Sequence, residues 1–339
     1  MTGVRLKDVA EQAGVSMKTV SNVVKGRSNV SEATRQRVLR TIDELGYRPN
    51  ASARHLRTGR SGIIALAVPE LDAPYFAELA AAVIAAARTR GCTVLIEDTG
   101  GDPSEELRIA SGLSQPLIDG VLLSPLGLDQ AALASRPGRI PLVLLGERDY
   151  DVAADHVLID NVAAAREATA HLLALGRRRV AAIGVQRGPA SATAHQRMRG
   201  YQEALFAAGV PFDPSLSVEV AAYRRPDGAR AMEALLALQD PPDAVFCFND
   251  LLATGAVRAV VDRGLSVPRD VAVVGFDDVG ETRYSVPSLT TIAPDKEQLA
   301  RLAVNALLSR LDDEDQGPPA VLRADFRLVV RESSGAVDH

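Results

Sequence analysis

The stretch from Leu6 to Val24 constrains the fold more than any other part of the chain, because it contains two short amphipathic helical patterns separated by a glycine. The apolar residues of the first pattern recur at the spacing of one helix face. These residues are Leu6, Val9, Ala10 and Ala13. Gly14 can end this helix, and Ser16 can cap a second helix that begins at Met17. Two short helices joined by so tight a turn predict a helix-turn-helix unit.

The second helix needs a partner for its apolar face, which we expect to consist of Val20, Val23 and Val24. A third helical pattern supplies that partner. It starts after an N-cap at Ser31 and ends at Gly46. Its apolar residues are Val38, Leu39, Ile42 and Leu45. Because three helices can close a minimal core, residues 1–49 are predicted to be a three-helix, helix-turn-helix headpiece.

Charge is distributed unequally between this region and the rest of the chain. Residues 1–60 contain 12 Lys or Arg and 5 Asp or Glu, a net charge of +7, whereas the whole chain carries −5. The remaining 279 residues therefore carry −12. A basic segment on an otherwise acidic protein is typical of an arm that binds nucleic acid.

The run from Val4 to Arg60 resembles the headpiece and hinge of the lactose-repressor (LacI/GalR) family of bacterial transcription regulators. The motifs that carry the resemblance are DVAEQAGVS, KTVSNVV, NVSEATRQRV, LGYRPN and NASARHL, and weaker similarity continues nearly to the C-terminus. The resemblance implies a sequence-specific regulator, most often a repressor, that binds a near-palindromic operator as a homodimer. It further implies that a small-molecule effector controls the binding of DNA.

The resemblance places contacts with DNA on the second helix. Met17, Lys18 and Asn22 are expected to read base edges in the major groove, because an ammonium suits guanine, an amide suits adenine and a thioether offers apolar contact. Small hydroxyl side chains near the helix starts are expected to contact phosphates. They are Ser16, Thr19, Ser21, Ser31 and Thr34. Many family members carry Arg at the position of Asn22, so the DNA half-site sequence that those members recognise cannot be assumed for this chain.

Residues 50–60 are too few and too polar to hold a helix alone, and we expect this hinge to fold only on DNA. The resemblance implies that the hinge helices of two subunits pack together in the minor groove. Ala53 would allow their close approach, Arg54 would lie near phosphates, and Leu56 would wedge between central base pairs. The alternative is a basic, flexible linker to which Leu56 contributes nothing.

Beyond Arg60, short apolar runs alternate with helical stretches. The runs are residues 63–68, 94–96, 121–123, 142–145, 157–159, 180–183, 218–220, 245–248 and 271–276. Continuous apolar runs of this kind predict parallel sheets that are covered on both faces. The fold class is therefore α/β, and the chain beyond the headpiece is long enough for two such sheets.

The resemblance also includes periplasmic sugar-binding proteins and implies an effector-binding and dimerisation domain over residues 61–339, with two Rossmann-like subdomains and a ligand cleft between them. We expect the N-terminal subdomain at about 61–161 plus 293–324 and the C-terminal subdomain at about 162–292 plus 325–339. The three connections are placed near residues 161–162, 292–293 and 324–327. No heptad pattern follows the last apolar segment, which predicts a dimer rather than a tetramer.

Ligands of open α/β sheets bind beyond the carboxyl ends of the strands. Polar or aromatic side chains follow several of the apolar runs, and the resemblance places an arginine nearby. The resulting candidate effector-binding residues are Asp72, Phe76, Arg148, Arg197, Asn249 and Asp277. They favour a hydroxylated compound such as a sugar or sugar derivative, while an acidic compound, a nucleoside or a purine remain alternatives. Asp250 and Asp278 can instead be N-caps, and Pro294 stands where many sugar-binding members have glutamine.

Other chemistry is scarce in the sequence. It contains no Gly-rich phosphate loop of either common pattern and no His pair at i, i+4, so we expect no enzyme activity, no metal site and no cofactor. Cys92 and Cys247 are expected to be reduced, and no segment approaches the roughly 18 apolar residues of a membrane span. These features favour a cytoplasmic DNA-binding regulator. The main alternative is a solute-binding protein whose DNA head no longer functions.

Overall fold

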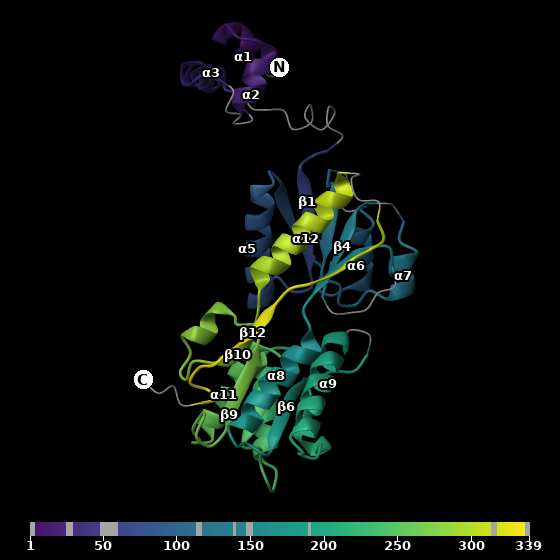
Figure 1. Cartoon of the computed structure of the whole chain (residues 1–339), viewed down its shortest axis with the longest axis vertical. Helices are drawn as coiled ribbons and strands as arrows, with labels where there is room; N and C mark the ends of the chain where they lie inside the picture. Colours follow the sequence, from purple (N-terminus) through teal and green to yellow (C-terminus); the bar gives the residue numbers. More distant parts are fainter. Residues whose placement is uncertain are drawn as a thin grey trace. The chain divides into compact units, whose positions relative to one another are not determined.

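The computed structural model describes residues 4–24, 30–47, 60–112, 117–137, 140–146, 152–188, 191–312 and 317–335. The chain forms two compact units, a headpiece (Met1–Ser61) and a core domain (Gly62–His339), both drawn in Figure 1. None of the helices in the described ranges combines the length and the apolar character that a membrane span requires.

The described residues of the headpiece form the three predicted helices. They are α1 (Leu6–Ala13), α2 (Met17–Val24) and α3 (Glu32–Leu45). α1 and α3 each end at a glycine in the left-handed region, Gly14 with φ +65° and Gly46 with φ +61°, which confirms the predicted helix ends. The predicted N-caps are also confirmed, because the hydroxyls of Ser16 and Ser31 each accept a hydrogen bond from the backbone N–H three residues later.

The interior of the headpiece is small. The residues buried in it include Val9, Val20, Val23, Val38 and Tyr47. The predicted burial of Val24 and Leu39 is wrong, since Val24 is 38% exposed and Leu39 is 40% exposed. Each follows a buried valine directly in the sequence, and neighbouring residues on a helix point about 100° apart. A core of this size covers only one residue of each such pair.

The core domain contains two six-stranded sheets that are packed against helices (Figure 1). The first sheet has the order β11-β5-β4-β3-β1-β2, and all its pairs are parallel. Its strands are β1 (Ile63–Val68), β2 (Thr93–Asp98), β3 (Gly120–Leu123), β4 (Leu142–Leu145), β5 (Asp155–Leu158) and β11 (Val321–Arg323). The helices of this N-terminal subdomain are α5 (Pro74–Thr89), α6 (Pro103–Ala110), α7 (Gln130–Ala134) and α12 (Lys296–Leu311).

The second sheet has the order β12-β10-β9-β8-β6-β7, in which β12 alone is antiparallel to its neighbour. Its strands are β6 (Val180–Val185), β7 (Ser217–Glu219), β8 (Ala244–Cys247), β9 (Ala272–Phe276), β10 (Thr290–Pro294) and β12 (Phe326–Val329). The helices of this C-terminal subdomain are α8 (Asn161–Ala174), α9 (Ala192–Ala207), α10 (Arg225–Leu236) and α11 (Asp250–Asp262), with the 3-10 helices η2 (Pro214–Leu216) and η3 (Gly280–Arg283). Each apolar run of the sequence therefore forms or overlaps a strand.

The chain passes between the two sheets three times. It leaves the first sheet after β5 and enters α8, it returns between β10 and α12, and it crosses finally between β11 and β12. Figure 1 shows the last crossing as the yellow segment that runs from the upper subdomain into β12. The two subdomains are thus joined by three short connections rather than by one linker.

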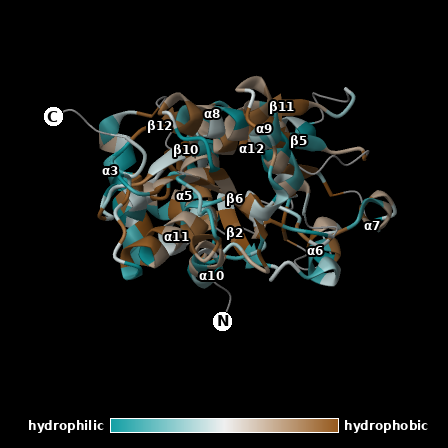
Figure 2. Cartoon of the chain, turned by 90° about the horizontal axis from the view of Figure 1, so that it is seen from below, coloured by the Kyte–Doolittle hydropathy of each residue, from teal (hydrophilic) through white to brown (hydrophobic). Residues whose placement is uncertain are grey.

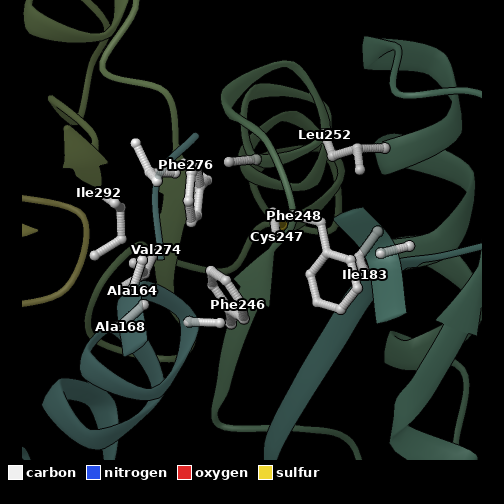
Figure 3. Packing of buried hydrophobic residues seen from close by; sticks show 14 of the residues in the cluster. Ala164, Ala168, Ile183, Phe246, Cys247, Phe248, Leu252, Val274, Phe276 and Ile292 are labelled. Atoms are coloured by element: carbon white, nitrogen blue, oxygen red, sulfur yellow. The ribbon is translucent and has the colours of Figure 1, made fainter. Parts of the chain in front are cut away.

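Parallel strands that are covered on both faces need an apolar interior, and both sheets have one. Figure 2 shows β6 as hydrophobic and α6 as largely hydrophilic. In Figure 3, Phe246 of β8 lies near Val274 of β9 and Ala168 of α8, and Phe248 lies beside Ile183 of β6. Cys92 and Cys247 are free thiols, which confirms the prediction, and burial raises the pKa of the Cys247 thiol.

Glycines allow the helices of the C-terminal subdomain to approach each other closely. A Cβ atom on Gly200 of α9 would overlap the backbone of α8 at Val162, and a Cβ atom on Gly228 of α10 would overlap the backbone of α11 at Leu252. Only glycine fits such contacts between backbones. The close packing holds α9 against the start of α8 and α10 against the start of α11, and both α9 and the start of α11 carry residues of the site.

Candidate functional site

The residues expected to read bases lie along α2 of the headpiece. Met17 is the first residue of this helix and is 54% exposed. Lys18 is exposed, and Asn22, about one turn later, is half-buried. An apolar side chain, an ammonium and an amide are therefore accessible near the start of one helix, which is the end that meets base edges in helix-turn-helix proteins.

The hydroxyl side chains that were predicted to contact phosphates lie mostly at helix starts. The hydroxyls of Ser16 and Thr19 are 2.9 Å apart, and those of Ser31 and Thr34 are also 2.9 Å apart. Each pair surrounds the N-terminus of a helix, where backbone N–H groups without a partner in the helix suit an anion such as a phosphate. Ser21 lies in the middle of α2 and caps no helix.

Four predicted site residues lie outside the described residues. They are Ala53, Arg54 and Leu56 of the hinge and Arg148 of the effector site. Their expected contacts with DNA and with an effector stay predictions.

A cavity of about 280 Å³ lies between the two sheets of the core domain. Residues one or two positions after strands of both sheets line it, among them Glu70 after β1, Gln186 after β6 and Asn249 after β8. The cavity therefore lies where the carboxyl ends of the two sheets meet, which is the usual position of a ligand in this class of fold. Its volume is near the lower limit of small-molecule sites, about 300 Å³.

The two walls of the cavity differ in polarity. The wall from the C-terminal subdomain carries most of the hydrogen-bonding side chains: Gln186, Thr193, Arg197, Tyr223, Asn249 and Asp277. The larger side chains of the other wall are mainly apolar: Tyr75, Phe76, Leu126, Leu144, Leu158 and Leu299. Among the described residues, polar side-chain groups on this second wall come from Glu70, Ser124 and the Tyr75 hydroxyl. A ligand that matches both walls has a polar edge and an apolar face.

Four of the predicted effector residues lie together on this cavity: Phe76, Arg197, Asn249 and Asp277. They come from α5, from α9 and from the ends of β8 and β9, so distant segments of the chain converge on one space. The rings of Tyr75 and Phe76 meet edge to face with their centroids 5.2 Å apart. This contact restrains the aromatic part of the apolar wall.

Arg197 is a buried cation that has no carboxylate partner among the described residues. It is 6% exposed, its Nε donates to Oδ1 of Asn161 (2.7 Å), and its Nη1 donates to the carbonyl oxygen of Phe248. Its guanidinium carbon lies 3.5 Å from the centroid of the Phe276 ring, a cation–π contact. No described residue accepts a hydrogen bond from Nη2. That donor is available to an oxygen of a ligand.

Asn249 connects the cavity to the start of α11. Its Oδ1 accepts a hydrogen bond from the backbone N–H of Leu252 (2.9 Å), which caps the helix. Its Nδ2 donates to the carbonyl oxygen of Tyr223 (3.2 Å), and the Tyr223 hydroxyl donates to the carbonyl oxygen of Gly184 (2.8 Å). These bonds hold the amide in one orientation at the polar wall.

The interpretation of Asp250 and Asp278 as N-caps is wrong. The residue that caps α11 is Asn249, and Asp250 is the first residue inside the helix. η3 begins after Val279 and has no side-chain cap. The sequence pattern could not separate these cases, because Asn249 and Asp250 are adjacent and both are good capping residue types.

Asp250 is instead a buried carboxylate next to Asp277. Its Oδ1 accepts a hydrogen bond from the Thr291 hydroxyl (2.6 Å), and its Oδ2 accepts one from the backbone N–H of Val279 (3.0 Å). Burial, and then the negative charge of Asp277, raise the pKa of Asp250 well above its ordinary value. Asp250 therefore supports the loop below the cavity, and Asp277 is the carboxylate that faces the ligand space.

Asp72 does not line the cavity. Its Oδ2 lies 3.2 Å from Nη1 of Arg224, whose Nη2 lies 3.1 Å from Oε2 of Glu70. Glu70 and Asp72 follow β1 of the N-terminal subdomain, whereas Arg224 precedes α10 of the C-terminal subdomain. The structure therefore places Asp72 in an exposed group of ion pairs that bridges the two subdomains, and Glu70 takes the nearer position to the cavity.

Sequence reasoning missed several polar side chains of the cavity. They are Glu70, Ser124, Gln186, Thr193 and Tyr223. Ser124 follows β3 and Gln186 follows β6, so the rule that ligands bind beyond the carboxyl ends of strands could have found both. Thr193 and Tyr223 carry no such signal, because they reach the cavity from the first turn of α9 and from the connection before α10.

Comparison with known proteins agrees with this two-part architecture. The family described as bacterial regulatory proteins, lacI family, matches residues 5–50, and the periplasmic binding protein-like domain matches residues 169–334. The HTH-type transcriptional repressor PurR of Haemophilus influenzae is 34% identical over 336 residues, which cover 97% of this chain and 98% of that protein.

Solved structures of similar proteins share the fold. A transcriptional regulator of the LacI family from Sanguibacter keddieii is 46% identical with a TM-score of 0.76, and the match covers 82% of this chain and all of the other. The lac repressor dimer bound to operator and the anti-inducer ONPF is 28% identical with a TM-score of 0.78. That match covers 99% of this chain and 100% of the repressor chain, so it includes both the headpiece and the core domain.

Proposed function

The chain belongs to the LacI family of bacterial regulatory proteins, which are DNA-binding transcription regulators rather than enzymes, and from this premise we propose how it acts. It binds a near-palindromic operator as a homodimer in the cytoplasm and acts as a repressor. A small hydroxylated effector, such as a sugar or sugar derivative, controls this binding from the core cavity. The observation that carries the proposal is the convergence of Phe76, Arg197, Asn249 and Asp277 on one cavity in a chain that also has a DNA-binding headpiece.

The headpiece supplies both parts of DNA recognition. Its net positive charge attracts the phosphate backbone, and the accessible side chains of Met17, Lys18 and Asn22 can read bases. One headpiece makes few contacts, so two linked headpieces on a palindrome gain affinity through effective concentration. The lac repressor structure described above is a dimer bound to operator, which supports this arrangement.

The polar wall of the cavity fits the hydroxyl edge of a ligand ring. The Asp277 carboxylate can accept from hydroxyls, Nη2 of Arg197 can donate to a hydroxyl oxygen, and the Asn249 amide can do either. Phe76 and the leucines opposite suit the apolar face of the same ring. Because the charges of Arg197 and Asp277 offset each other, the cavity favours a neutral ligand over an acidic one.

Control of DNA binding follows from the position of the cavity. Each subdomain contributes one wall, so a ligand that contacts both walls stabilises the subdomain arrangement in which they face each other. The arrangement that a ligand favours then changes the affinity for operator by linkage, and an inducer and a co-repressor differ only in the sign of that change. The predicted hinge, residues 50–60, is the segment through which we expect the change to reach the headpiece.

Selection of bound duplexes from a random pool tests this function. The purified full-length protein is expected to recover a near-palindromic sequence, and one compound of a sugar, nucleoside and organic acid panel is expected to weaken or strengthen its binding. Lys18→Ala should lower affinity for the selected duplex by about 1–3 kcal/mol and relax the preference at one base pair. Lys7→Ala, which removes an exposed lysine paired with Glu11 on α1, is the matched control.

Two results would contradict the proposal. Binding that depends on salt but not on sequence would instead indicate a solute-binding protein whose headpiece no longer reads DNA. A selected duplex whose binding no panel compound changes would contradict control by a small hydroxylated effector.

A further inference from the structure

The loop that carries Asp277 to the cavity is bound by both subdomains. It runs from Asp277, directly after β9, to Gly280, the first residue of η3, and is here named the Asp277 loop. Within its own subdomain, the backbone N–H of Asp277 donates to the carbonyl oxygen of Ile292 (2.8 Å), and that of Val279 donates to Asp250 (3.0 Å). These bonds anchor the loop to β10 and α11.

Two side chains of the N-terminal subdomain bind the same loop. Oε1 of Glu78, on α5, accepts a hydrogen bond from the backbone N–H of Gly280 (2.7 Å). Nζ of Lys296, on α12, donates to the carbonyl oxygen of Asp278 (3.1 Å) and to Oε2 of Glu78 (2.6 Å). Glu78, Lys296 and the Asp277 loop therefore form a closed set of hydrogen bonds across the boundary between the subdomains.

The Glu78–Lys296 ion pair also lies close to the apolar wall of the cavity. Glu78 is two residues after Phe76 on α5, and Nζ of Lys296 lies 5.8 Å from the centroid of the Tyr75 ring. Lys296 is the first residue of α12, directly after the second crossing of the chain. The pair thus connects one wall of the cavity, the loop of the other wall and a crossing between the subdomains.

The backbone of the Asp277 loop needs support to keep its conformation. Asp277 has φ +120° and Asp278 has φ +47°, and they are the two non-glycine residues with positive φ among the described residues. Such conformations persist only where the surrounding contacts determine them. Loss of the contacts from the N-terminal subdomain would let the loop relax and would move the Asp277 carboxylate away from the ligand space.

We propose that Glu78 and Lys296 are positioning residues for Asp277, so that the effector site is complete only while the two subdomains keep the arrangement of this structure. This inference rests on the proposed function of the cavity. By linkage, an effector that binds Asp277 stabilises the arrangement in which Glu78 and Lys296 reach the loop. Binding of DNA that favours or disfavours this arrangement must then change the stability of the loop.

Hydrogen–deuterium exchange of the full-length protein tests the positioning contacts. Lys296→Met and Glu78→Gln each remove one charge of the pair, and Arg301→Met and Glu297→Gln remove the matching charges of an exposed ion pair on α12. We expect peptides that span residues 277–284 to exchange about tenfold faster in the first two variants, as the loss of a hydrogen bond to a charged group implies. The two control variants should exchange as the wild type does.

A double variant shows whether the two residues act as a pair. If they do, Glu78→Gln combined with Lys296→Met exchanges no faster in the Asp277 loop than the faster single variant. If the increase in exchange rate of the double variant equals the product of the two single increases, the residues act independently, which would contradict a pair. Circular dichroism spectra and melting temperatures that match those of Arg301→Met show that the variants are folded, and Glu78→Gln alone carries the test if Lys296→Met does not fold.

Exchange in the presence of the selected duplex separates this inference from the proposed function. Binding of the duplex should change exchange in the wild-type loop by about fivefold, and this change should disappear in Lys296→Met, which still binds the duplex. If the wild type binds no selected duplex, the proposed function is contradicted. The comparison of loop exchange between wild type and variants without DNA still tests whether Glu78 and Lys296 hold the Asp277 loop. If the Asp277 loop exchanges at the same rate in the wild type, in Lys296→Met and in the controls, the proposal that Lys296 positions Asp277 is overturned. If the duplex does not change hydrogen–deuterium exchange of the Asp277 loop in the wild type, the link between this loop and the headpiece is overturned.

Discussion

The headpiece and the core domain hold their candidate functional side chains by contacts of different range along the chain. In the headpiece, the paired hydroxyls at the starts of α2 and α3 are three residues apart. In the core domain, Arg197 bonds to Asn161, 36 residues away, and to Phe248, 51 residues away. The surface expected to read DNA is therefore set by local sequence, whereas the cavity exists only in the completely folded core domain.

This difference indicates which substitutions separate function from folding. A change on the surface of α2 alters what the headpiece contacts and little else. A change at the polar wall of the cavity alters the ligand contacts and the interior packing together. The next four predictions test this contrast.

The largest effect is expected from Arg197→Met. The variant leaves Oδ1 of Asn161 and the carbonyl oxygen of Phe248 without their donor in the interior. The free energy of unfolding of the core domain should fall by about 2–4 kcal/mol, and the response of duplex binding to the effector should disappear. Denaturant unfolding and duplex titration measure both. Arg199→Met, which removes an exposed arginine paired with Glu203, is the control. Equal free energies of unfolding for Arg197→Met and Arg199→Met would show that the hydrogen bonds of Arg197 to distant residues do not stabilise the core domain.

A smaller effect that depends on pH is expected from Asp278→Asn. Burial alone would raise the pKa of Asp278, but the hydrogen bonds and charges of Arg331 and Arg283 outweigh it and lower the pKa. The carboxylate therefore stabilises the core domain above its unfolded pKa of about 3.9, and the stabilisation is lost as the pH falls through the lowered value. The variant should unfold about 1–3 kcal/mol more easily at neutral pH and approach the wild type in acid.

Melting curves of Asp278→Asn and wild type between neutral and acidic pH check this dependence. Asp262→Asn, which breaks an exposed ion pair on α11, is the control and should differ little from the wild type at any pH. A difference between Asp278→Asn and wild type that does not change with pH would show that the charge of Asp278 is not its cause.

Ser16→Ala should have an effect of about 1 kcal/mol that is confined to the headpiece. The variant removes the cap of α2, since the Ser16 hydroxyl accepts from the backbone N–H of Thr19 (3.1 Å). Amide exchange of α2 measures the loss, and Ser21→Ala removes a hydroxyl from the same helix without removing a cap. A lower melting temperature of the core domain in Ser16→Ala would break the contrast between the two units.

The smallest effect is expected from Arg224→Gln, although Arg224 pairs with Asp72, 152 residues away. The ion pairs are exposed to solvent, so salt screens them and the melting temperature should change little. Thermal melts at low and at high salt measure this. A large loss at low salt would show that the range of a contact along the chain, rather than its burial, determines its contribution.

The headpiece could be predicted almost completely from the sequence, because its determinants are local. The caps at Ser16 and Ser31 and the left-handed glycines at positions 14 and 46 each act within one turn of a helix. Nine of the described strands could be predicted for a similar reason, since a run of apolar residues between turn residues has few other uses. β10, β11 and β12 were not among the predicted runs. The errors at Val24 and Leu39 concern how much of a helix a small core covers, which depends on the assembled helices.

The cavity could be predicted only as a region. The rule on the carboxyl ends of strands selects Asp72 and Asp277 equally, yet Asp72 pairs with Arg224 and Asp277 lines the cavity. The outcome depends on the backbone of each loop, such as φ +120° at Asp277, and on partners that lie far away in the sequence. The support of the Asp277 loop by Glu78 and Lys296 belongs to the same class of features, and no local pattern marks those two residues.

The three crossings between the sheets affect how genes of this kind can exchange parts. The headpiece occupies one continuous stretch at the start of the chain, so a single recombination breakpoint can exchange it as a unit. Exchange of one subdomain of the core needs a breakpoint at each of the three crossings. A new DNA specificity can therefore be acquired in one recombination event, whereas the walls of the cavity, which come from interleaved segments, change mainly by point substitution.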